Sequence, residues 1–402
     1  MEDRGGRYKR ALAGEPLPAA LVDLDALEAN ARRLFEPIRA AGKRARIATK
    51  SLRCPELIAR ATALGGDLVL GLMTYTAAET AFHAEAGARD LLLAYPTLSP
   101  HDAAHLARAN QLGATAATVV DDAAQLPVLA EAARAAGVTI PVAIDVDMSW
   151  RPLGAHVGVR RSPLRDPDAV VALARQIAAH RGLAFHGVLG YEAQLAGLPD
   201  RGAHKAWQNP IKRALKRGSE PAIIERRARV VAALTAAGLP PAIVNGGGTG
   251  SVDWSSTDGA LTEITIGSGF LCGHLFDGYR GLDLEPALAF ALPIVRRPAP
   301  RVVTCLGGGW IASGAAGADR LPKPAWPPGC ALLAAEGAGE VQTPVAVPAD
   351  VDATLTLGDP IFFRPAKSGE LAEHVRDYLL VRGDRIVGRA PTYRGLGHCF
   401  LG

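Results

Sequence analysis

The sequence lacks long hydrophobic runs and has little cysteine. No stretch of 18 consecutive apolar residues occurs in its 402 residues, which excludes a hydrophobic membrane span. The first twenty residues are charged and contain no apolar core, so we expect no signal peptide and a cytoplasmic location. The five cysteines are widely spaced and form no CxxC pair, which predicts free thiols in a reducing compartment.

A large excess of charge of either sign is also absent. The 44 Lys and Arg residues against 40 Asp and Glu residues leave a formal net charge of +4, which is too small to indicate nucleic acid or an anionic membrane as a partner. Hydrophobic residues make up 49% and charged residues 21%, so the composition excludes global disorder. The length fits one barrel of about 250 residues plus a smaller domain.

Short apolar runs alternate with helical patterns over the first two thirds of the chain. Strands that alternate with helices of about 10–15 residues predict right-handed βαβ units and a parallel sheet. About eight such units favour a closed (β/α)₈ barrel, a TIM barrel, over an open sheet, so the predicted class is α/β. The runs expected as strands are 18–24, 44–50, 67–72, 90–96, 114–120, 139–147, 183–191, 241–247 and 262–269. The first of these runs is assigned to the barrel.

The pattern changes near residue 271. Pro and Gly become frequent there, and short strand-like runs replace the helical patterns, which is typical of a mostly antiparallel β domain. We therefore expect a barrel over residues 18–270 and a β domain over residues 271–402, which residues 1–17 can join. A basic segment, 200–218, interrupts the barrel and is expected to be helical in part. A solvated helix and a lid that attracts a substrate carboxylate are both open interpretations of this segment.

Polar and glycine-rich groups follow the expected strands, at the end where TIM barrels carry reactive groups. Lys50 closes the strand 44–50, and a lysine beside an apolar core can lose its charge and attack a carbonyl. The alternative is a lysine whose charged end reaches solvent from a strand end. The turn NGGGTGS, residues 245–251, is either a plain tight loop or a set of backbone N–H groups that hold a phosphate. Together the two features point to pyridoxal 5'-phosphate (PLP), an aldehyde with one phosphate.

In these motifs the sequence resembles the fold-type III PLP enzymes, the alanine racemase barrel group. Within that group it is similar to D-threonine aldolase, D-serine dehydratase and the amino acid deaminase/aldolase proteins. The resemblance covers nearly the whole chain and rests on PAALVDLDALEAN, RIATKS, DLLLAYP, IDVD, GYEAQ, VNGGGTGS and ITIGSG, in that order. It implies a homodimer in which the β domain of each subunit completes the active site of the other.

The resemblance also implies a role for each matched residue. Lys50 would hold PLP as a Schiff base. Arg151 or Arg160 would lie near the cofactor, and Asp147 would either orient that arginine or cap a turn. The other residues expected to bind the cofactor are Tyr191, Gln194, Asn245, Gly247, Gly248, Thr249, Gly250, Gly267 and Ser268.

The C-terminus departs from the family pattern. D-threonine aldolase and D-serine dehydratase carry a His-x-Asp or His-x-Cys pair that binds a divalent metal, whereas His398 and Cys399 are adjacent here. Adjacent side chains on a strand point to opposite faces, so we predict no catalytic metal. Lys50, His398 and Arg151 are the catalytic candidates, and the catalytic base stays open between a released Lys50, His398 and another histidine. Tyr393, His398 and Cys399 are candidates to reach the neighbouring subunit's site.

The leading hypothesis is a PLP-dependent lyase that acts on β-hydroxy D-amino acids, by retro-aldol cleavage or by dehydration and deamination. A metal-independent amino acid racemase is the second hypothesis. A non-catalytic PLP-binding protein is the third, and residues 271–402 argue against it because such proteins are usually single barrels. The expected partner is a small amino acid, with neither nucleic acid nor membrane involved.

Overall fold

The computed structural model describes residues 4–202 and 206–401, which form two compact units. The barrel unit comprises residues 34–50, 65–267 and 400–401. The sheet unit comprises residues 4–33, 51–64 and 268–399. Within the described part of the chain, no helix is both long enough and apolar enough to cross a membrane.

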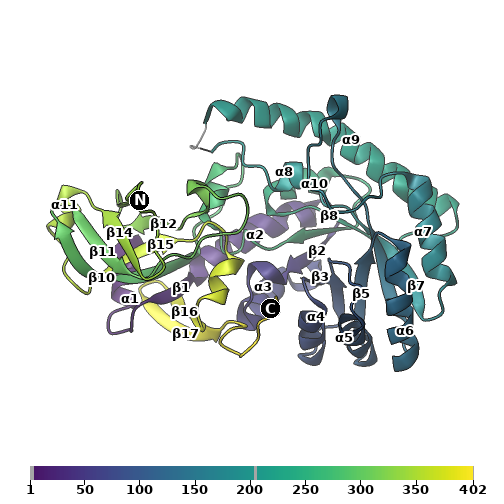
Figure 1. Cartoon of the computed structure of the whole chain (residues 1–402), viewed down its shortest axis with the longest axis horizontal. Helices are drawn as coiled ribbons and strands as arrows, with labels where there is room; N and C mark the ends of the chain where they lie inside the picture. The colour runs from purple at the N-terminus through teal and green to yellow at the C-terminus, as the bar shows by residue number, and fades with distance from the viewer. Residues whose placement is uncertain (1–3, 203–205, 402) are drawn as a thin grey trace. The chain divides into compact units, whose positions relative to one another are not determined.

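Eight parallel strands close the barrel, which confirms the predicted TIM barrel (Figure 1). The strands follow one another in chain order, and the last strand pairs with the first. Leu92, Val119 and Ile243 belong to a buried apolar cluster contributed by these strands. The barrel strands are β2 (Arg44–Ala48), β3 (Val69–Thr74), β4 (Asp90–Leu93), β5 (Thr115–Val120), β6 (Ile140–Asp145), β7 (Leu183–Leu189), β8 (Ile243–Gly246) and β9 (Glu263–Ile266).

Helices precede or connect the barrel strands, and local signals in the sequence set several of their ends. Ser99 accepts a hydrogen bond from the Asp102 N–H at the start of α5, with Pro100 in the first turn. Gly137 ends α6 in the left-handed conformation, with φ of 67°. The helices are α2 (Leu24–Ala40), α3 (Pro55–Gly65), α4 (Ala77–Glu85), α5 (Pro100–Gln111), α6 (Leu126–Ala136), α7 (Pro167–Ala179), α8 (Ala193–Ala196), α9 (Asn209–Ala236) and α10 (Val252–Thr257).

The basic segment 200–218 does not form a separate helix. Its second half is the start of α9, a continuous helix of 28 residues, so the segment is helical in part, as expected (Figure 1). Before α9, residues 203–205 lie outside the described residues. The Arg213 guanidinium donates to the Asp200 carbonyl oxygen at 3.1 Å, which fastens the start of α9 to the chain that precedes it.

A buried ionic cluster lies inside the barrel. The Arg46 guanidinium on β2 donates to both carboxylate oxygens of Glu263 on β9, at 2.8 and 2.9 Å, and to Asp90 on β4 at 2.6 Å. Arg46 and Glu263 are each only 1% exposed. Burial alone would lower the pKa of Arg46, but the two carboxylates raise it above its usual value, so Arg46 stays charged. The cluster therefore ties the first strand of the barrel to the last.

The sheet unit is a nine-stranded, mostly antiparallel sheet, and its antiparallel character agrees with the prediction for residues 271–402. Its apolar core includes Leu21, Phe362 and Leu379, against which Tyr8 of α1 packs. Its strands are β1 (Ala19–Asp23), β10 (Leu288–Ala299), β11 (Val302–Leu306), β12 (Lys323–Trp326), β13 (Ala331–Leu332), β14 (Gln342–Ala346), β15 (Pro360–Arg364), β16 (Asp377–Arg382) and β17 (Arg385–Pro391), with helices α1 (Arg4–Ala11) and α11 (Ala349–Asp352).

The first apolar run belongs to this sheet, so its assignment to the barrel is wrong. β1 pairs antiparallel with β10 and parallel with β16. Four of its five residues are buried, and a short apolar run buried on both faces suits a central strand of either sheet. The periodicity of the run therefore cannot tell which sheet it joins. The domain limit expected near residue 270 stays a prediction.

We expect Arg46→Met to lower the free energy of unfolding by about 3–5 kcal/mol, because it leaves buried carboxylates without their cation. Removing the carboxylate as well, in Arg46→Met/Glu263→Met, should recover part of this loss. Urea unfolding measures both variants. Arg44→Met, on the same strand but exposed, is the control and should change stability by about 0.5 kcal/mol or less. Equal stability of the Arg46 and Arg44 variants would contradict a structural role for the cluster.

Candidate active site

Three neighbouring barrel strands bring Lys50 and the glycine turn to the same end of the barrel. β9 pairs with both β2 and β8, and all three run parallel. Lys50 follows β2, Gly267 follows β9 and Gly247 follows β8. Neighbouring strands lie about 4.8 Å apart, so the ends of β2 and β8 are separated by about 10 Å. This is the carboxyl end of the strands, where TIM barrels carry reactive groups.

The Lys50 side chain is exposed, and its amine forms a hydrogen bond with a tyrosine hydroxyl. The Lys50 Nζ donates to the Tyr95 Oη at 3.1 Å, in the segment that follows β4. Next to Lys50, the Thr49 hydroxyl donates to the Met73 carbonyl oxygen at 3.0 Å, which fixes the end of β2 to β3. The backbone at this position is therefore anchored, while the amine faces the open end of the barrel.

The glycine turn after β8 can be built only with small residues. Gly247 has φ of +81°, and a Cβ atom there would lie 2.7 Å from the Ile264 Cγ2. A Cβ atom on Gly248 would lie 3.0 Å from the Ala196 Cβ and 3.5 Å from the Tyr191 ring. The backbone of the turn therefore packs closely against the segment that follows β7, and side chains on these glycines would not fit between them.

A second buried ionic network holds this turn and the Tyr191 segment together. The Arg227 guanidinium of α9 donates to the Glu192 carboxylate at 3.0 Å and also pairs with Asp258. The Ser255 hydroxyl of α10 donates to the other Glu192 oxygen at 2.7 Å, and Ser251 lies 3.0 Å from the Ser255 Oγ. Arg227 and Glu192 are no more than 1% exposed. The network fixes Tyr191 and the glycine turn relative to each other.

Arg161 is the arginine that reaches the barrel end. Its guanidinium carbon lies 5.3 Å from the centroid of the Tyr191 ring, a cation–π contact. Burial, the largest influence, raises the pKa of Tyr191 to about 12, although Arg161 acts in the opposite direction. A small pocket lies between these groups, lined by Asp145, Val146, Asp147, Met148, Val159, Arg161, Ser162 and Tyr191.

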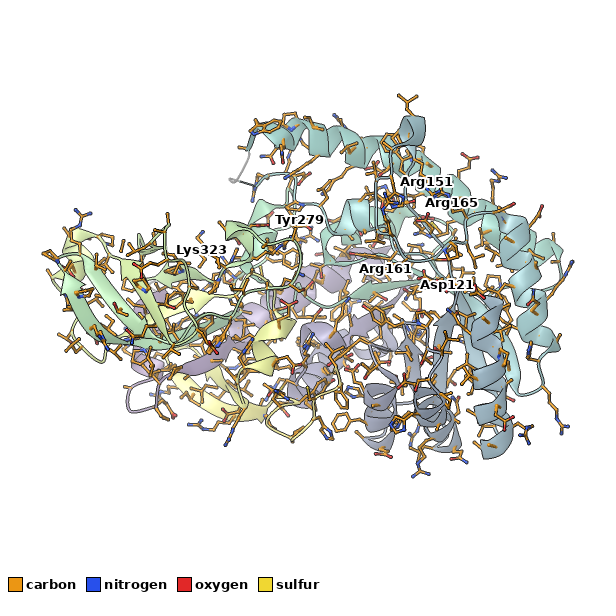
Figure 2. The ribbon with its side chains drawn as sticks, in the orientation of Figure 1. Asp121, Arg151, Arg161, Arg165, Tyr279 and Lys323 are labelled. Atoms are coloured by element: carbon orange, nitrogen blue, oxygen red, sulfur yellow. The ribbon has the colours of Figure 1, made fainter. Side chains whose placement is uncertain are left out.

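Asp145, the last residue of β6, borders the same pocket and titrates near neutrality. Burial raises the pKa of its carboxyl to about 7, and the negative charges of Asp121 and Asp147 act in the same direction. Arg161 lowers this pKa in part. Figure 2 shows Asp121 and Arg161 close to the barrel strands. The pocket therefore contains a carboxyl that can carry or release a proton near pH 7.

Arg151 lies in a different cluster, which surrounds Asp147. Arg151 and Arg165 donate to the same Asp147 oxygen, at 3.0 and 2.7 Å, and Figure 2 shows the two side by side near α9. Arg226 of α9 donates to the Asp147 carbonyl oxygen at 3.1 Å. Asp147 therefore pairs with Arg151 and also caps a turn, because its other oxygen accepts from the Ser149 N–H at 2.8 Å. Both contacts belong to a cluster that ties the loop after β6 to α9. Arg160, the other sequence candidate, is exposed.

The remaining predicted residues have varied surroundings. The buried Gln194 amide donates to the Met148 carbonyl oxygen at 2.7 Å, and its Oε1 has no partner among the described residues. The Asn245 amide donates to Glu263 at 2.7 Å and to Thr265 at 2.8 Å, inside the barrel. Gly267 and Ser268 directly follow β9, and Thr249 and Gly250 form the short helical turn after Gly248. Their cofactor-binding roles stay predictions.

His398 and Cys399 do not lie on a strand, contrary to the expectation from the sequence. β17 ends at Pro391, and a turn over residues 393–397 precedes His398, whose N–H donates to the Tyr393 carbonyl oxygen at 2.8 Å. His398 and Cys399 therefore do not point to opposite faces of a strand. Over residues 4–202 and 206–401, no group of three His, Cys, Asp or Glu side chains is placed to hold a metal ion. A metal-free reaction and a catalytic role for His398 stay predictions.

Sequence reasoning assigned no role to Tyr95, Asp145 or Arg161. Tyr95 and Asp145 were visible as residues at strand ends, the position that marks reactive groups in this fold. Arg161 follows Arg160 directly, and only the path of the long loop after β6 decides which of them faces Tyr191. No sequence pattern carries that information.

The raised pKa of Asp145 makes stability depend on pH. Its folded pKa of about 7 exceeds the usual 3.8, so the folded chain holds the proton more tightly, and this stabilisation is lost as the pH rises through 7. We expect the wild type to lose roughly 2 kcal/mol more than Asp145→Asn between pH 5 and pH 8, measured as a decrease in Tm of a few degrees. Asp168→Asn, an exposed control, should match the wild type. Parallel pH curves for Asp145→Asn and the wild type would contradict this assignment.

Known proteins resemble the chain in both sequence and fold. A 3-hydroxy-D-aspartate aldolase of Paracoccus denitrificans (strain Pd 1222) is 29% identical over 251 residues, which is 62% of this chain and 59% of that protein. A D-threonine aldolase of Arthrobacter sp is 27% identical over 314 residues, 74% of each chain. The crystal structure of D-threonine aldolase from Filomicrobium marinum has the same fold, with a TM-score of 0.81 at 24% identity over 96% of both chains.

The family assignment rests on the barrel. The family described as alanine racemase, N-terminal domain, matches residues 22–270. That range contains all eight barrel strands, Lys50, the glycine turn and the pocket beside Arg161. Because the match covers more than half of the chain, the protein belongs to the alanine racemase N-terminal domain family.

Proposed function

We propose that the protein is a PLP-dependent lyase for β-hydroxy D-amino acids. One observation carries the proposal: in a barrel of the alanine racemase family, an amine at the end of β2 faces the open end of the barrel that also carries the glycine turn. The relatives named above are aldolases for 3-hydroxy-D-aspartate and D-threonine, which supports this class of substrate. The match spans only 59% of the Paracoccus protein, so its activity is proposed for this chain and not transferred.

The residues at the barrel end fit the chemistry of PLP. Lys50 supplies the primary amine that an aldehyde requires. The turn at residues 247–250 has no side chain at three of its four positions, so its backbone N–H groups can approach a phosphate, with the Thr249 hydroxyl beside them. Gly267 and Ser268 would contribute from the end of the neighbouring strand. Tyr191 and Arg161 would lie against the ring.

PLP, when bound, withdraws electrons from the substrate Cα and so weakens the bonds to that carbon. The protein decides which bond breaks by holding the substrate in one orientation and by placing the groups that move protons. Asp145, with its pKa near 7, can hold a proton at the pocket or release one. Arg161 offers a positive charge to a substrate carboxylate, and the Arg227–Glu192 network keeps Tyr191 and the turn in place.

The cofactor assignment predicts that Lys50→Ala loses PLP. The purified wild type should show the absorbance of bound PLP, and mass spectrometry after borohydride reduction should find a pyridoxyl group on Lys50. Lys50→Ala should show neither signal, since no other amine is proposed to hold the aldehyde. Lys9→Ala, a variant of an exposed lysine in the sheet unit, is the control and should retain both signals. A colourless wild type without PLP would end this proposal.

The substrate assignment is tested with a panel of D- and L-amino acids and product identification. An aldolase should convert D-threonine to glycine and acetaldehyde, and 3-hydroxy-D-aspartate to glycine and glyoxylate. A dehydratase should instead release ammonia and an oxo acid. Racemisation of alanine or serine in D₂O without cleavage would favour the racemase alternative. Activity that survives EDTA is expected, whereas complete loss that Mn²⁺ restores would overturn the metal-free prediction.

Two features predicted from the sequence belong to this proposal. We propose a homodimer with shared active sites, as the family resemblance implies. We also propose a cytoplasmic location, which fits the five free cysteines. Both rest on the sequence and the family resemblance.

A further inference from the structure

We propose that Tyr95 is the proton-transfer partner of Lys50 and thereby a catalytic residue of the proposed lyase. In this step the N–H bond of the Lys50 ammonium breaks and its electron pair stays on Nζ. The proton forms an O–H bond on the Tyr95 phenolate. The products are a neutral amine, which can act as a nucleophile, and a neutral phenol. The inference rests on the proposed function, since it gives Lys50 its nucleophilic role.

The geometry places the two reacting atoms within hydrogen-bond distance. The Lys50 Nζ lies 3.1 Å from the Tyr95 Oη, whereas it lies 5.8 Å from the centroid of the Tyr95 ring. The amine therefore contacts the hydroxyl at the edge of the ring and not the ring face. Lys50 follows β2 and Tyr95 follows β4, on either side of β3, so paired strands hold both residues at the same end of the barrel. Proton transfer over such a distance needs no rearrangement of the backbone.

The charges around Tyr95 favour its ionised form. Burial alone would raise the pKa of Tyr95, and Asp145 acts in the same direction. The Lys50 charge, its hydrogen bond and the Arg161 charge act against burial and together bring the pKa below its ordinary value. Tyr191 is the fourth group that interacts with Tyr95, and its own pKa is raised to about 12. Of these two phenols at the barrel end, Tyr95 is therefore the one that ionises first.

The pair solves a problem that a single lysine has at neutral pH. An ordinary lysine amine has a pKa of about 10.4 and is almost fully protonated, so it is a poor nucleophile. Once Tyr95 is ionised, its phenolate oxygen can accept a proton from Nζ across the hydrogen bond that joins them. When that proton resides on Oη, Nζ is a free amine. Tyr95 can return the proton when Lys50 leaves a carbonyl carbon.

The test is a tyrosinate titration of the full-length chain, followed by ultraviolet difference absorbance. The wild type should contain one tyrosine that ionises below the ordinary midpoint near pH 10, and Tyr95→Phe should lack it. In Lys50→Met the midpoint of this tyrosine should rise by about 1 pH unit or more, because the neighbouring positive charge is gone. Tyr279→Phe is the control and should retain the early ionisation. An early ionisation that persists in Tyr95→Phe, or that does not move in Lys50→Met, overturns the proposal.

A kinetic measurement separates this inference from the proposed function. Tyr95→Phe removes only a hydroxyl, and it should lower kcat on the best substrate by about 10²-fold or more with a small change in KM. The rate at which added PLP attaches to Lys50 should fall as well, and its pH dependence should lose the ionisation assigned to Tyr95. A wild type that takes up no PLP refutes the proposed function, while the titration still tests the pair. Unchanged attachment rate and kcat in Tyr95→Phe overturn the inference and leave the lyase assignment intact.

Discussion

The contact between Arg46 and Glu263 is the constraint on which the barrel end depends. Two hydrogen bonds between these buried, charged side chains join the first and last barrel strands. The Asn245 amide on β8 donates to the same Glu263 carboxylate, so the contact also includes the strand next to β9. Such a pair is costly to break on one side, so it specifies the register of β2 against β9. Lys50 lies four residues beyond Arg46, and Gly267 lies four residues beyond Glu263. The contact that closes the barrel therefore also sets the positions of the groups at its open end.

A second constraint acts from outside the strands. Arg227 on α9 reaches Glu192 and Asp258, so one long helix holds the segments that carry Tyr191 and α10. The three arginines around Asp147 tie the loop after β6 to the same helix and its neighbourhood. In this way charged hydrogen bonds, as well as the buried Val146 and Met148 side chains, fix the loops that border the pocket.

Much of the fold and part of the site could be predicted from the sequence. The alternation of apolar runs and helices predicted the closed barrel, because each βα unit can pack in only one hand. Gly247 was recognisable because it lies in the glycine run NGGGTGS after an apolar strand, and the structure explains the need for glycine by its φ and by the nearby Ile264 side chain. The sheet to which β1 belongs could not be predicted, because a run of five residues with four buried fits the interior of either sheet. Arg161 and the Lys50–Tyr95 contact were also missed, because they depend on how a loop and two separate strands meet in space.

The position of β1 has a consequence for synthesis of the chain on the ribosome. Its two partner strands, β10 and β16, lie about 270 and 360 residues later in the chain. β1 therefore has no partner strand while the barrel strands are being synthesised. The barrel, by contrast, is complete in sequence at residue 266. The nascent chain therefore carries an apolar strand without its partner strands until after the whole barrel has been synthesised.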